Sequence, residues 1–292
     1  MPVDAMQPLE TVSLESARRS FAEELCRTNR ISSPAILAAF SSVLREHFVG
    51  PGPWMIQVSG AQTFTESADP RNVYQDALIV LDAAKHLNNG QPSLWAFHLS
   101  LLDVHPGDHV LHLGCGAGYY SAILAELVGP HGRVVAVEID ESLADRARIA
   151  LEPWPQVIVV HADGARGPFD PADAIVVSAG ATHPLHSWLA ALKPEGKLLF
   201  PLTPTRGPGA MAYVVRKCAL LSAATLCGSV FFVDFEGARD PSVSDELNRA
   251  LKRDHGFSVR SLRCDFHEKD DSCWLHGDGW CFSRHAPIAA PE

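Results

Sequence analysis

The chain has 292 residues, of which 47% are hydrophobic, and a formal net charge of -10 at pH 7. This length accommodates one large α/β domain with additions or two small domains, and no apolar run reaches the ~18 to 20 residues that a membrane helix requires. Without such a run we expect no membrane partner, and because the negative charge repels phosphate backbones we expect no nucleic acid partner. The N-terminus has no basic start followed by an apolar core, and the seven cysteines form no disulfide framework, which favours a cytoplasmic protein.

The N-terminal third is predicted to be helix and loop. Apolar residues recur at helical spacing over residues 14–28, and Ser33-Pro34 is typical of a helix start, so a second helix is predicted to residue 45. Residues 47–71 contain three prolines and three glycines and are predicted to be loop. Residues 73–87 fit either periodicity.

Strands alternate regularly with helices in the middle of the chain. Strands are predicted at residues 109–113, 134–137, 157–161, 173–178 and 197–201, and helices at 93–102, 119–128 and 185–192. Such alternation predicts right-handed crossovers and a doubly wound sheet. Ligands of doubly wound sheets bind at the carboxyl ends of the strands.

The last ninety residues depart from this alternation. Residues 211–215 and 229–234 are predicted to be antiparallel strands joined by an apolar link, followed by a helix at 244–253 and short strands at 259–262 and 273–283. We therefore divide the chain into a region that caps the active site (1–105), a cofactor-binding core (106–235) and a C-terminal extension packed on that core (236–292).

The first central strand leads into three closely spaced glycines, Gly114, Gly116 and Gly118. Glycine lets the main chain turn sharply and lets a ligand lie against bare backbone. A dinucleotide site reads G-x-G-x-x-G, because a pyrophosphate must reach the helix N-terminus, but here Tyr119 follows the third glycine. This spacing favours S-adenosylmethionine over NAD(P), and a methyltransferase over a dehydrogenase. Glu138, at the tip of the next strand, can accept hydrogen bonds from ribose hydroxyls.

The stretch VLHLGCGAGYYSAILAELVG (110–129) resembles motif I of the protein-L-isoaspartate O-methyltransferase family. Five further segments resemble other elements of this family: ILAAFSSVLREHFVG (36–50), VYQDALIVL (73–81), HADGARG (161–167), DAIVVSAGATHPL (173–185) and LKPEGKLLFPL (192–202). The resemblance covers about residues 15–235. It implies a doubly wound, mostly parallel, seven-stranded Rossmann-like sheet with N-terminal helices and a small C-terminal β addition. It also implies a carboxyl O-methyltransferase with S-adenosylmethionine as donor and S-adenosylhomocysteine as product.

The resemblance also implies where the donor binds. The glycines would flank its methionine part, Glu138 would hold the ribose, and Asp163 with Gly164 would contact the adenine. The expected cofactor-binding residues are Gly114, Cys115, Gly116, Gly118, Tyr119, Glu138, Ile139, Asp163 and Gly164. One departure is His112, where the family usually has an acid.

The acceptor side departs further from the family. Family members read Thr-Ile-Ser before Gln-Pro, and the serine lies beside the transferring methyl group, but this chain has Gly90 at the serine position. Candidate catalytic residues are Asn88, Asn89, Gln91 and His183, and Ser93 lies close by. A carboxylate acceptor needs no general base, whereas a phenol or an amine would profit from one such as His183. The acceptor is thus a peptide carboxylate, a small molecule or a modified peptide. The alternative is a cofactor-binding protein without catalysis, and the oligomeric state is open.

Two pairs near the C-terminus, Cys264 with His267 and Cys273 with His276, have the spacing of zinc ligands. However, the segment also predicts a hairpin around Gly277-Asp278-Gly279, in which strand alternation would scatter the ligands over both faces. We therefore expect no metal.

Overall fold

The structure is a computed structural model that describes residues 13–58 and 60–287. Most of the N-terminal segment in which we expected no signal sequence lies outside the described residues, as do the outer ends of the capping region and of the extension. Within the described part, no helix is both long and apolar enough to cross a membrane.

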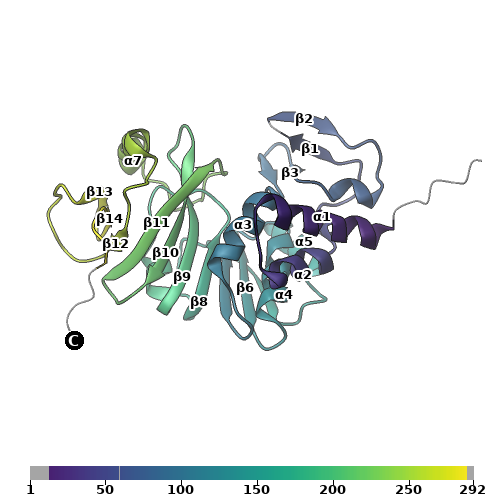
Figure 1. Cartoon of the computed structure of the whole chain (residues 1–292), viewed down its shortest axis with the longest axis horizontal. Coiled ribbons are helices and arrows are strands. Elements are labelled where there is room, and N and C mark those ends of the chain that lie inside the picture. The colour runs from purple at the N-terminus through teal and green to yellow at the C-terminus, as the bar shows by residue number, and fades with distance from the viewer. Residues whose placement is uncertain (1–12, 59, 288–292) are drawn as a thin grey trace, which may run out of the picture.

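Ten strands form the main sheet, in the order β13-β14-β12-β11-β10-β9-β8-β5-β6-β7 (Figure 1). They are β5 (His109–Leu113), β6 (Arg133–Glu138), β7 (Val157–His161), β8 (Ala172–Val177), β9 (Leu192–Leu202), β10 (Gly209–Arg216), β11 (Leu221–Val230), β12 (Ser261–Arg263), β13 (Cys273–Gly277) and β14 (Trp280–Ser283). The pairings from β9 through β8, β5 and β6 to β7 are parallel, and the others are antiparallel. The predicted α/β fold is confirmed.

Helices cover both faces of this sheet. They are α3 (Pro92–Leu102), α4 (Tyr119–Val128), α5 (Glu141–Ala150), α6 (His186–Ala191) and α7 (Pro241–Asp254). Alternate residues of β5 point into opposite cores, because side chains alternate along a strand. Val110 packs in the core with α3, α4 and α5, whereas Leu111 and Leu113 pack in the core with α6 and α7. Burial on both faces explains why the central strands are almost continuously apolar.

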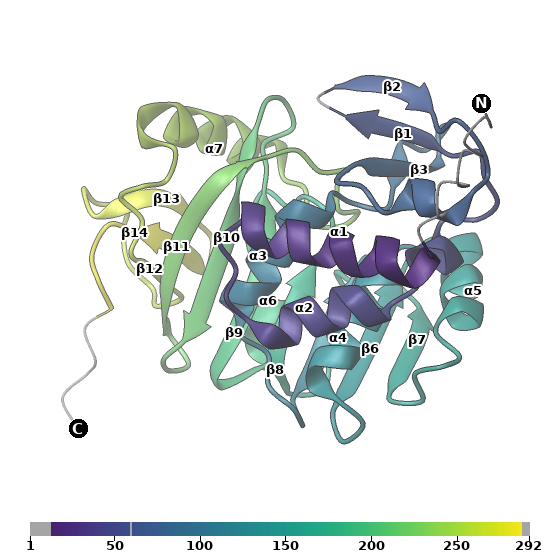
Figure 2. The same ribbon diagram turned by 45° about the vertical axis from the view of Figure 1, so that its right-hand side comes forward.

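Two N-terminal helices, α1 (Leu14–Thr28) and α2 (Pro34–Ser42), lie side by side, and α2 packs on α4 while α1 contacts α3 (Figure 2). The hydroxyl of Ser33 accepts a hydrogen bond from the amide of Ile36 at 3.4 Å, and proline follows at the first helical position, as predicted for this helix start. The second helix ends at Ser42, earlier than predicted, and a 3₁₀ turn η1 (Arg45–Phe48) follows.

A separate four-stranded sheet, ordered β2-β1-β3-β4, lies beside these helices. Its strands are β1 (Met55–Val58), β2 (Ala61–Phe64), β3 (Leu78–Asp82) and β4 (Leu87–Asn88), and the 3₁₀ turn η2 (Pro70–Val73) lies between β2 and β3. The prediction of loop over residues 47–71 is therefore wrong for β1 and β2. All four residues of β2 are exposed, so no alternation of apolar residues marked the strand.

Arg45 fastens this small sheet to the helices. Its side chain is fully buried, with Nη1 donating to the carbonyl oxygens of Val73 and Gln75 and Nη2 to that of Ala77, each at 2.8 Å. The guanidinium also lies 5.8 Å from the ring centroid of Tyr119. Because a buried cation is costly unless its donors are used, these three acceptors fix the chain entering β3.

The C-terminal half differs from prediction in one strand and contains the predicted β addition. The apolar link expected between two strands is itself the strand β11 (Leu221–Val230), while residues 231–234 form only an isolated bridge at Asp234. The seven strands from β11 to β7 are mostly parallel, as predicted. The strands β12, β14 and β13 are the predicted C-terminal β addition, and they continue the same sheet beyond β11.

The predicted scattering of the C-terminal cysteines and histidines is also wrong. The pairing of β13 with β14 shifts register between Cys273 and Leu275, so strict alternation fails at this bulge. As a result, ligand atoms of His267, Cys273, His276 and Cys281 all lie within 4.8 Å of one another.

Candidate functional site

The glycine turn joins β5 to α4 at the carboxyl end of the sheet. Gly114, Gly116 and Gly118 have φ values of 72°, 58° and 94°. Residues other than glycine rarely adopt such positive φ values. A Cβ on Gly118 would lie 2.7 Å from Leu151 Cδ1, so close packing also requires this glycine. A Cβ on Gly116 would meet nothing within 4 Å. The main chain at Gly116 is therefore open to a ligand.

The carboxylate of Glu138, at the end of β6, lies against this turn. Its Oε2 accepts a hydrogen bond from the Gly116 amide at 2.7 Å, and its Oε1 accepts from the amides of Ile139 and Asp140, each at 3.0 Å. A carboxylate has about four lone-pair sites, so roughly one remains for a further donor such as a ribose hydroxyl. The Ile139 side chain beside it is 41% exposed.

Asp163 and Gly164 follow β7, the neighbour of β6. Asp163 accepts from the Ala165 amide at 2.8 Å through Oδ1, and its Oδ2 lies 2.9 Å from Arg166 Nε. The Gly164 carbonyl accepts from Trp188 Nε1 at 2.9 Å. Because β5, β6 and β7 run in parallel, the glycine turn, Glu138 and Asp163 lie at one edge of the sheet.

These residues fit S-adenosylmethionine by their chemistry. Bare main chain at Gly116 offers space for the methionine part, and the Glu138 carboxylate suits hydroxyl donors and disfavours a phosphate. The residues that could hold the cofactor are therefore Gly114, Gly116, Glu138, Ile139, Asp163 and Gly164.

Two of the predicted cofactor residues are buried. The ring of Tyr119 is 1% exposed and packs edge-on against Phe40 and Phe48, with centroids 6.3 and 5.7 Å away. We therefore interpret the Tyr119 side chain as packing in the core and not as contacting the cofactor. Cys115 is also buried, and burial raises the pKa of its thiol, with Glu138 adding to the shift. Such a thiol stays protonated and is no nucleophile.

The segment that departs from the family, residues 88–92, is tightly held. Asn88 Oδ1 accepts from the Gly90 amide at 2.8 Å, and Gln91 Nε2 donates to Asp76 Oδ2 at 3.0 Å. Asn89 is 6% exposed, and its buried Nδ2 has no hydrogen-bond partner among the described residues. Gly90 has a φ of 66°, and a Cβ there would lie 2.7 Å from Trp95 Nε1. A side chain at this position would therefore be strained and would meet the Trp95 ring.

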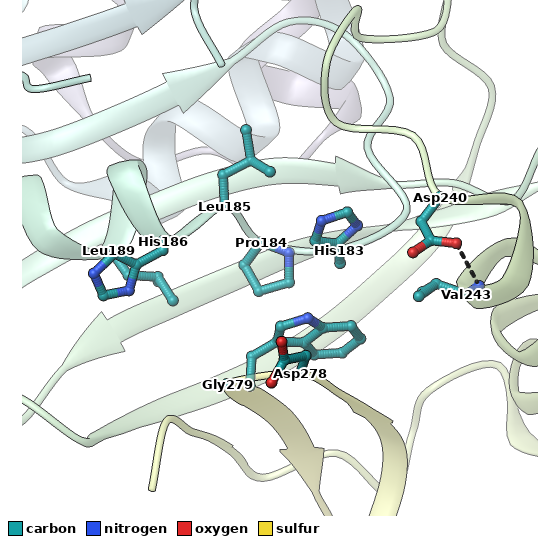
Figure 3. Close-up of a pocket in the computed structure, with 10 residues that line it drawn as sticks. His183, Pro184, Leu185, His186, Leu189, Asp240, Val243, Asp278 and Gly279 are labelled. Atoms are coloured by element: carbon teal, nitrogen blue, oxygen red, sulfur yellow. Dashed lines mark hydrogen bonds between the residues drawn. The ribbon is translucent and has the colours of Figure 1, made fainter. Parts of the chain in front are cut away.

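A pocket of ≈ 390 Å³ opens beside the loop that follows β8 (Figure 3). His183 and Pro184 of that loop line it, together with Asp240 before α7 and Asp278 from the β13–β14 turn. The ring of His183 stacks on Trp280, with centroids 5.8 Å apart and planes inclined by 14°. Burial lowers the pKa of His183 and outweighs the opposing effect of Asp240, so its imidazole is neutral at pH 7.

The extension supplies residues that the sequence motifs missed. Asp240, Asp278 and Trp280 all line the pocket but follow the last family-like segment. Only the tertiary pairing of β14 with β12 brings Trp280 beside His183.

Comparisons with known proteins agree with this geometry. The family model described as protein-L-isoaspartate(D-aspartate) O-methyltransferase matches residues 17–239. A protein-L-isoaspartate O-methyltransferase of Pyrobaculum arsenaticum is 32% identical over 205 residues, which are 68% of this chain and 90% of the relative. One of Methanopyrus kandleri is 41% identical over 131 residues, which are 42% of this chain. The match spans 58% of the Methanopyrus protein's own length.

Two solved structures are similar as well. A protein-L-isoaspartate O-methyltransferase is 26% identical with a TM-score of 0.64, covering 80% of this chain and 69% of its own. A Plasmodium falciparum protein, described as a putative enzyme of this kind in complex with S-adenosyl-L-homocysteine, is 17% identical with a TM-score of 0.61, covering 75% and 98%. The second likeness shows the fold alone. From the extent of the family match, the chain belongs to the protein-L-isoaspartate(D-aspartate) O-methyltransferase family.

Proposed function

We propose that this chain is an S-adenosylmethionine-dependent O-methyltransferase that methylates the carboxylate of an isoaspartyl residue in a peptide or protein. The observation that carries the proposal is the placement of the Glu138 carboxylate, 2.7 Å from the amide of Gly116 and beside open main chain. The site thus offers a ribose acceptor next to a bare backbone surface, and family membership supplies the reaction class.

S-adenosylmethionine, when bound, supplies an electrophilic methyl group on a sulfonium. The contribution of the protein is to align the acceptor with that group and to exclude water. We assign donor binding to the glycine turn, Glu138, Ile139, Asp163 and Gly164. An ionised carboxylate acceptor, with an unperturbed pKa of about 4, needs no general base.

We assign acceptor binding to residues 88–91 and to the pocket beside His183. The buried amide of Asn89, whose Nδ2 has no partner among the described residues, is available to donate a hydrogen bond to a carboxylate. Asn88 and Gln91 hold this segment in place through their contacts with Gly90 and Asp76. The neutral imidazole of His183 supplies a base only if the acceptor carries a proton.

The test measures methyl transfer from labelled donor to an isoaspartyl peptide, with the aspartyl peptide of the same sequence as control. We expect transfer to the isoaspartyl peptide alone. Binding of the donor without transfer to any isoaspartyl peptide would disprove the acceptor assignment and favour a different acceptor or a protein without catalysis.

The donor site is tested separately with Glu138→Ala. Loss of one charged hydrogen bond, worth about 1.5 to 3 kcal/mol, should raise the Kd for S-adenosylhomocysteine at least about tenfold. The matched control is Glu152→Ala, which removes an exposed acid outside the site. Equal Kd values for both variants would show that the donor binds elsewhere.

We also propose that residues 1–105 cap the site, that 106–235 form the donor-binding core and that 236–292 pack on this core. The ion pair between Lys85 of the small sheet and Asp140 beside Glu138 supports the first assignment. The odd number of cysteines supports a reducing compartment, and we propose the cytoplasm.

A further inference from the structure

Four side chains of the C-terminal extension converge on one point. Cys273 and His276 come from β13, Cys281 from β14 and His267 from the loop between β12 and β13. Their ligand atoms all lie within 4.8 Å of one another. We propose that they bind a structural zinc ion.

Two distances from Cys273 to the histidines match those of a tetrahedral site, and the whole set, within 4.8 Å, is slightly wider than a site closed around an ion. With Zn–S near 2.3 Å and Zn–N near 2.0 Å, neighbouring ligand atoms of a tetrahedron lie about 3.3 to 3.8 Å apart. Cys273 Sγ lies 3.6 Å from His267 Nε2 and 3.8 Å from His276 Nδ1. The two imidazole rings have centroids 4.8 Å apart and are inclined by 78°, so they approach a common point from different directions.

The strand register explains how the ligands come together. His276 and Cys281 are directly paired across β13 and β14, which places both side chains on one face. The bulge between Cys273 and Leu275 changes the alternation, so that Cys273 shares this face although it lies three residues from His276. The fourth residue, His267, reaches the cluster from outside the sheet.

Groups around the cluster orient these ligands. His267 Nδ1 lies 2.9 Å from the carbonyl oxygen of Asp265, which leaves Nε2 facing Cys273. Metal-binding histidines commonly use their second nitrogen in this way. The backbone amide of Asp270 donates to Cys273 Sγ at 3.4 Å, an interaction that stabilises a thiolate.

The donor set favours zinc over other metals. Two sulfur and two nitrogen ligands in a tetrahedron suit zinc, whereas magnesium and calcium require oxygen ligands. Binding releases the two thiol protons to solvent, and the two thiolates then balance the charge of Zn²⁺. Four protein ligands fill the coordination sphere, so the site is structural and not catalytic.

The site has a clear mechanical role. The zinc would join the loop at His267 to both strands of the β13–β14 hairpin. The strands of this extension are short, so they gain little stability from their own pairing. His276 and Cys281 flank the hairpin turn, and the neighbouring Trp280 stacks on His183 in the pocket. By holding the hairpin, the metal fixes the position of Trp280, which forms one wall of that pocket.

The first test measures metal in the full chain, purified without a histidine tag from cells supplied with zinc. We expect about one zinc per chain by mass spectrometry, and replacement by Co²⁺ should give the ligand-field and thiolate charge-transfer bands of a tetrahedral site. Absence of both zinc and Co²⁺ binding would overturn the proposal. So would a disulfide between Cys273 and Cys281, seen as the loss of two hydrogens from the intact mass.

The second test compares two cysteine variants. Cys281→Ser should retain less than about a tenth of the zinc, whereas Cys264→Ser, a matched change in the same extension but outside the cluster, should retain all of it. Undiminished zinc in Cys281→Ser would also overturn the proposal. If Cys281→Ser does not fold, the cobalt spectrum of the unaltered chain still decides the question. None of these readouts depends on the methyl acceptor.

Discussion

The ring of His112 bridges two serine hydroxyls, with Nδ1 2.8 Å from Ser121 Oγ and Nε2 2.8 Å from Ser178 Oγ. His112 is fully buried at the position where the family usually has an acid, and burial lowers its pKa to about 3. A neutral imidazole has one donor and one acceptor nitrogen. It therefore matches two hydroxyls, because a hydroxyl can either donate or accept a hydrogen bond. His112 thus links β5, α4 and the loop after β8 directly beneath the glycine turn.

This bridge predicts loss of stability in acid. The pKa of His112 is about 3 in the folded chain and near 6.5 when unfolded, so the unfolded state binds the extra proton between these values. The contribution of His112 to the free energy of unfolding is complete above pH 6.5 and is lost as the pH falls towards 3. Between pH 6.5 and 5 we expect a loss of roughly 2 kcal/mol from this residue.

The measurement is urea unfolding at several pH values for the unaltered chain and His112→Asn. The asparagine does not titrate, so its unfolding free energy should fall by about 1.4 kcal/mol less per pH unit in this window. Parallel pH profiles would show that His112 is charged in the folded state. Burial also lowers the pKa of His98, to about 4. The pH dependence due to His98 is present in the unaltered chain and in His112→Asn alike, so it cancels in the comparison.

Restoring the family's serine should not restore a family-like site. Gly90→Ser places a side chain at a φ of 66° and a Cβ within 2.7 Å of Trp95 Nε1. We expect a loss of about 1 to 3 kcal/mol in unfolding free energy and no gain in methyl transfer. The control is Gly207→Ser, which has a φ of 92° but meets nothing within 4 Å. Equal stability losses would exclude a clash at Gly90.

Arg45→Met should destabilise the chain strongly. The change leaves the carbonyl oxygens of Val73, Gln75 and Ala77 without their donor, and each such group costs about 1 to 3 kcal/mol. We expect a loss of at least about 3 kcal/mol in chemical unfolding. Arg19→Met removes only an exposed pair with Glu23 and should cost less than about 1 kcal/mol. Similar losses in the two variants would contradict the role of Arg45.

Trp280→Ala should affect the acceptor and spare the donor. Removing the ring takes away one wall of the pocket at His183, so we expect KM for the acceptor to rise several-fold while the Kd for S-adenosylhomocysteine stays unchanged. Steady-state kinetics and calorimetry measure the two constants. Phe266→Ala removes an aromatic ring of the same extension that is fully exposed and should change neither. An unchanged KM in Trp280→Ala would place the acceptor outside this pocket.

The central sheet was predictable because local pattern and tertiary role agree there. The apolar runs of β5 and β8 are dictated by burial on both faces. The glycines before α4 are dictated by their positive φ values. By contrast, β2 is exposed throughout and shows no alternation, so only its pairing with β1 defines it. The segment before Ser229 belongs to β11, although its sequence is typical of a connection between strands. The reason is that β11 is only partly buried and therefore not continuously apolar.

The candidate site was predictable in part for the same reason. The contact between Glu138 and Gly116 was predictable from chain order. Glu138 is the last residue of β6, and Gly116 follows the neighbouring strand β5. Tyr119 faces the core because α2 and η1 pack on it, which no local motif records. The four-ligand cluster depends on one bulge near Cys273, and a single inserted residue in a strand is invisible to a rule of strict alternation.

The three strands that the extension adds to the sheet have a consequence for behaviour in solution. Without β12, the backbone amides and carbonyls of β11 at Leu221 and Ala223 would face solvent as an open edge. An open edge can recruit a strand from another molecule and so begin aggregation. By pairing with β11, the extension moves the edge of the sheet to β13, a strand of 5 residues in place of one of 10, so a shorter edge is left for another molecule to pair with.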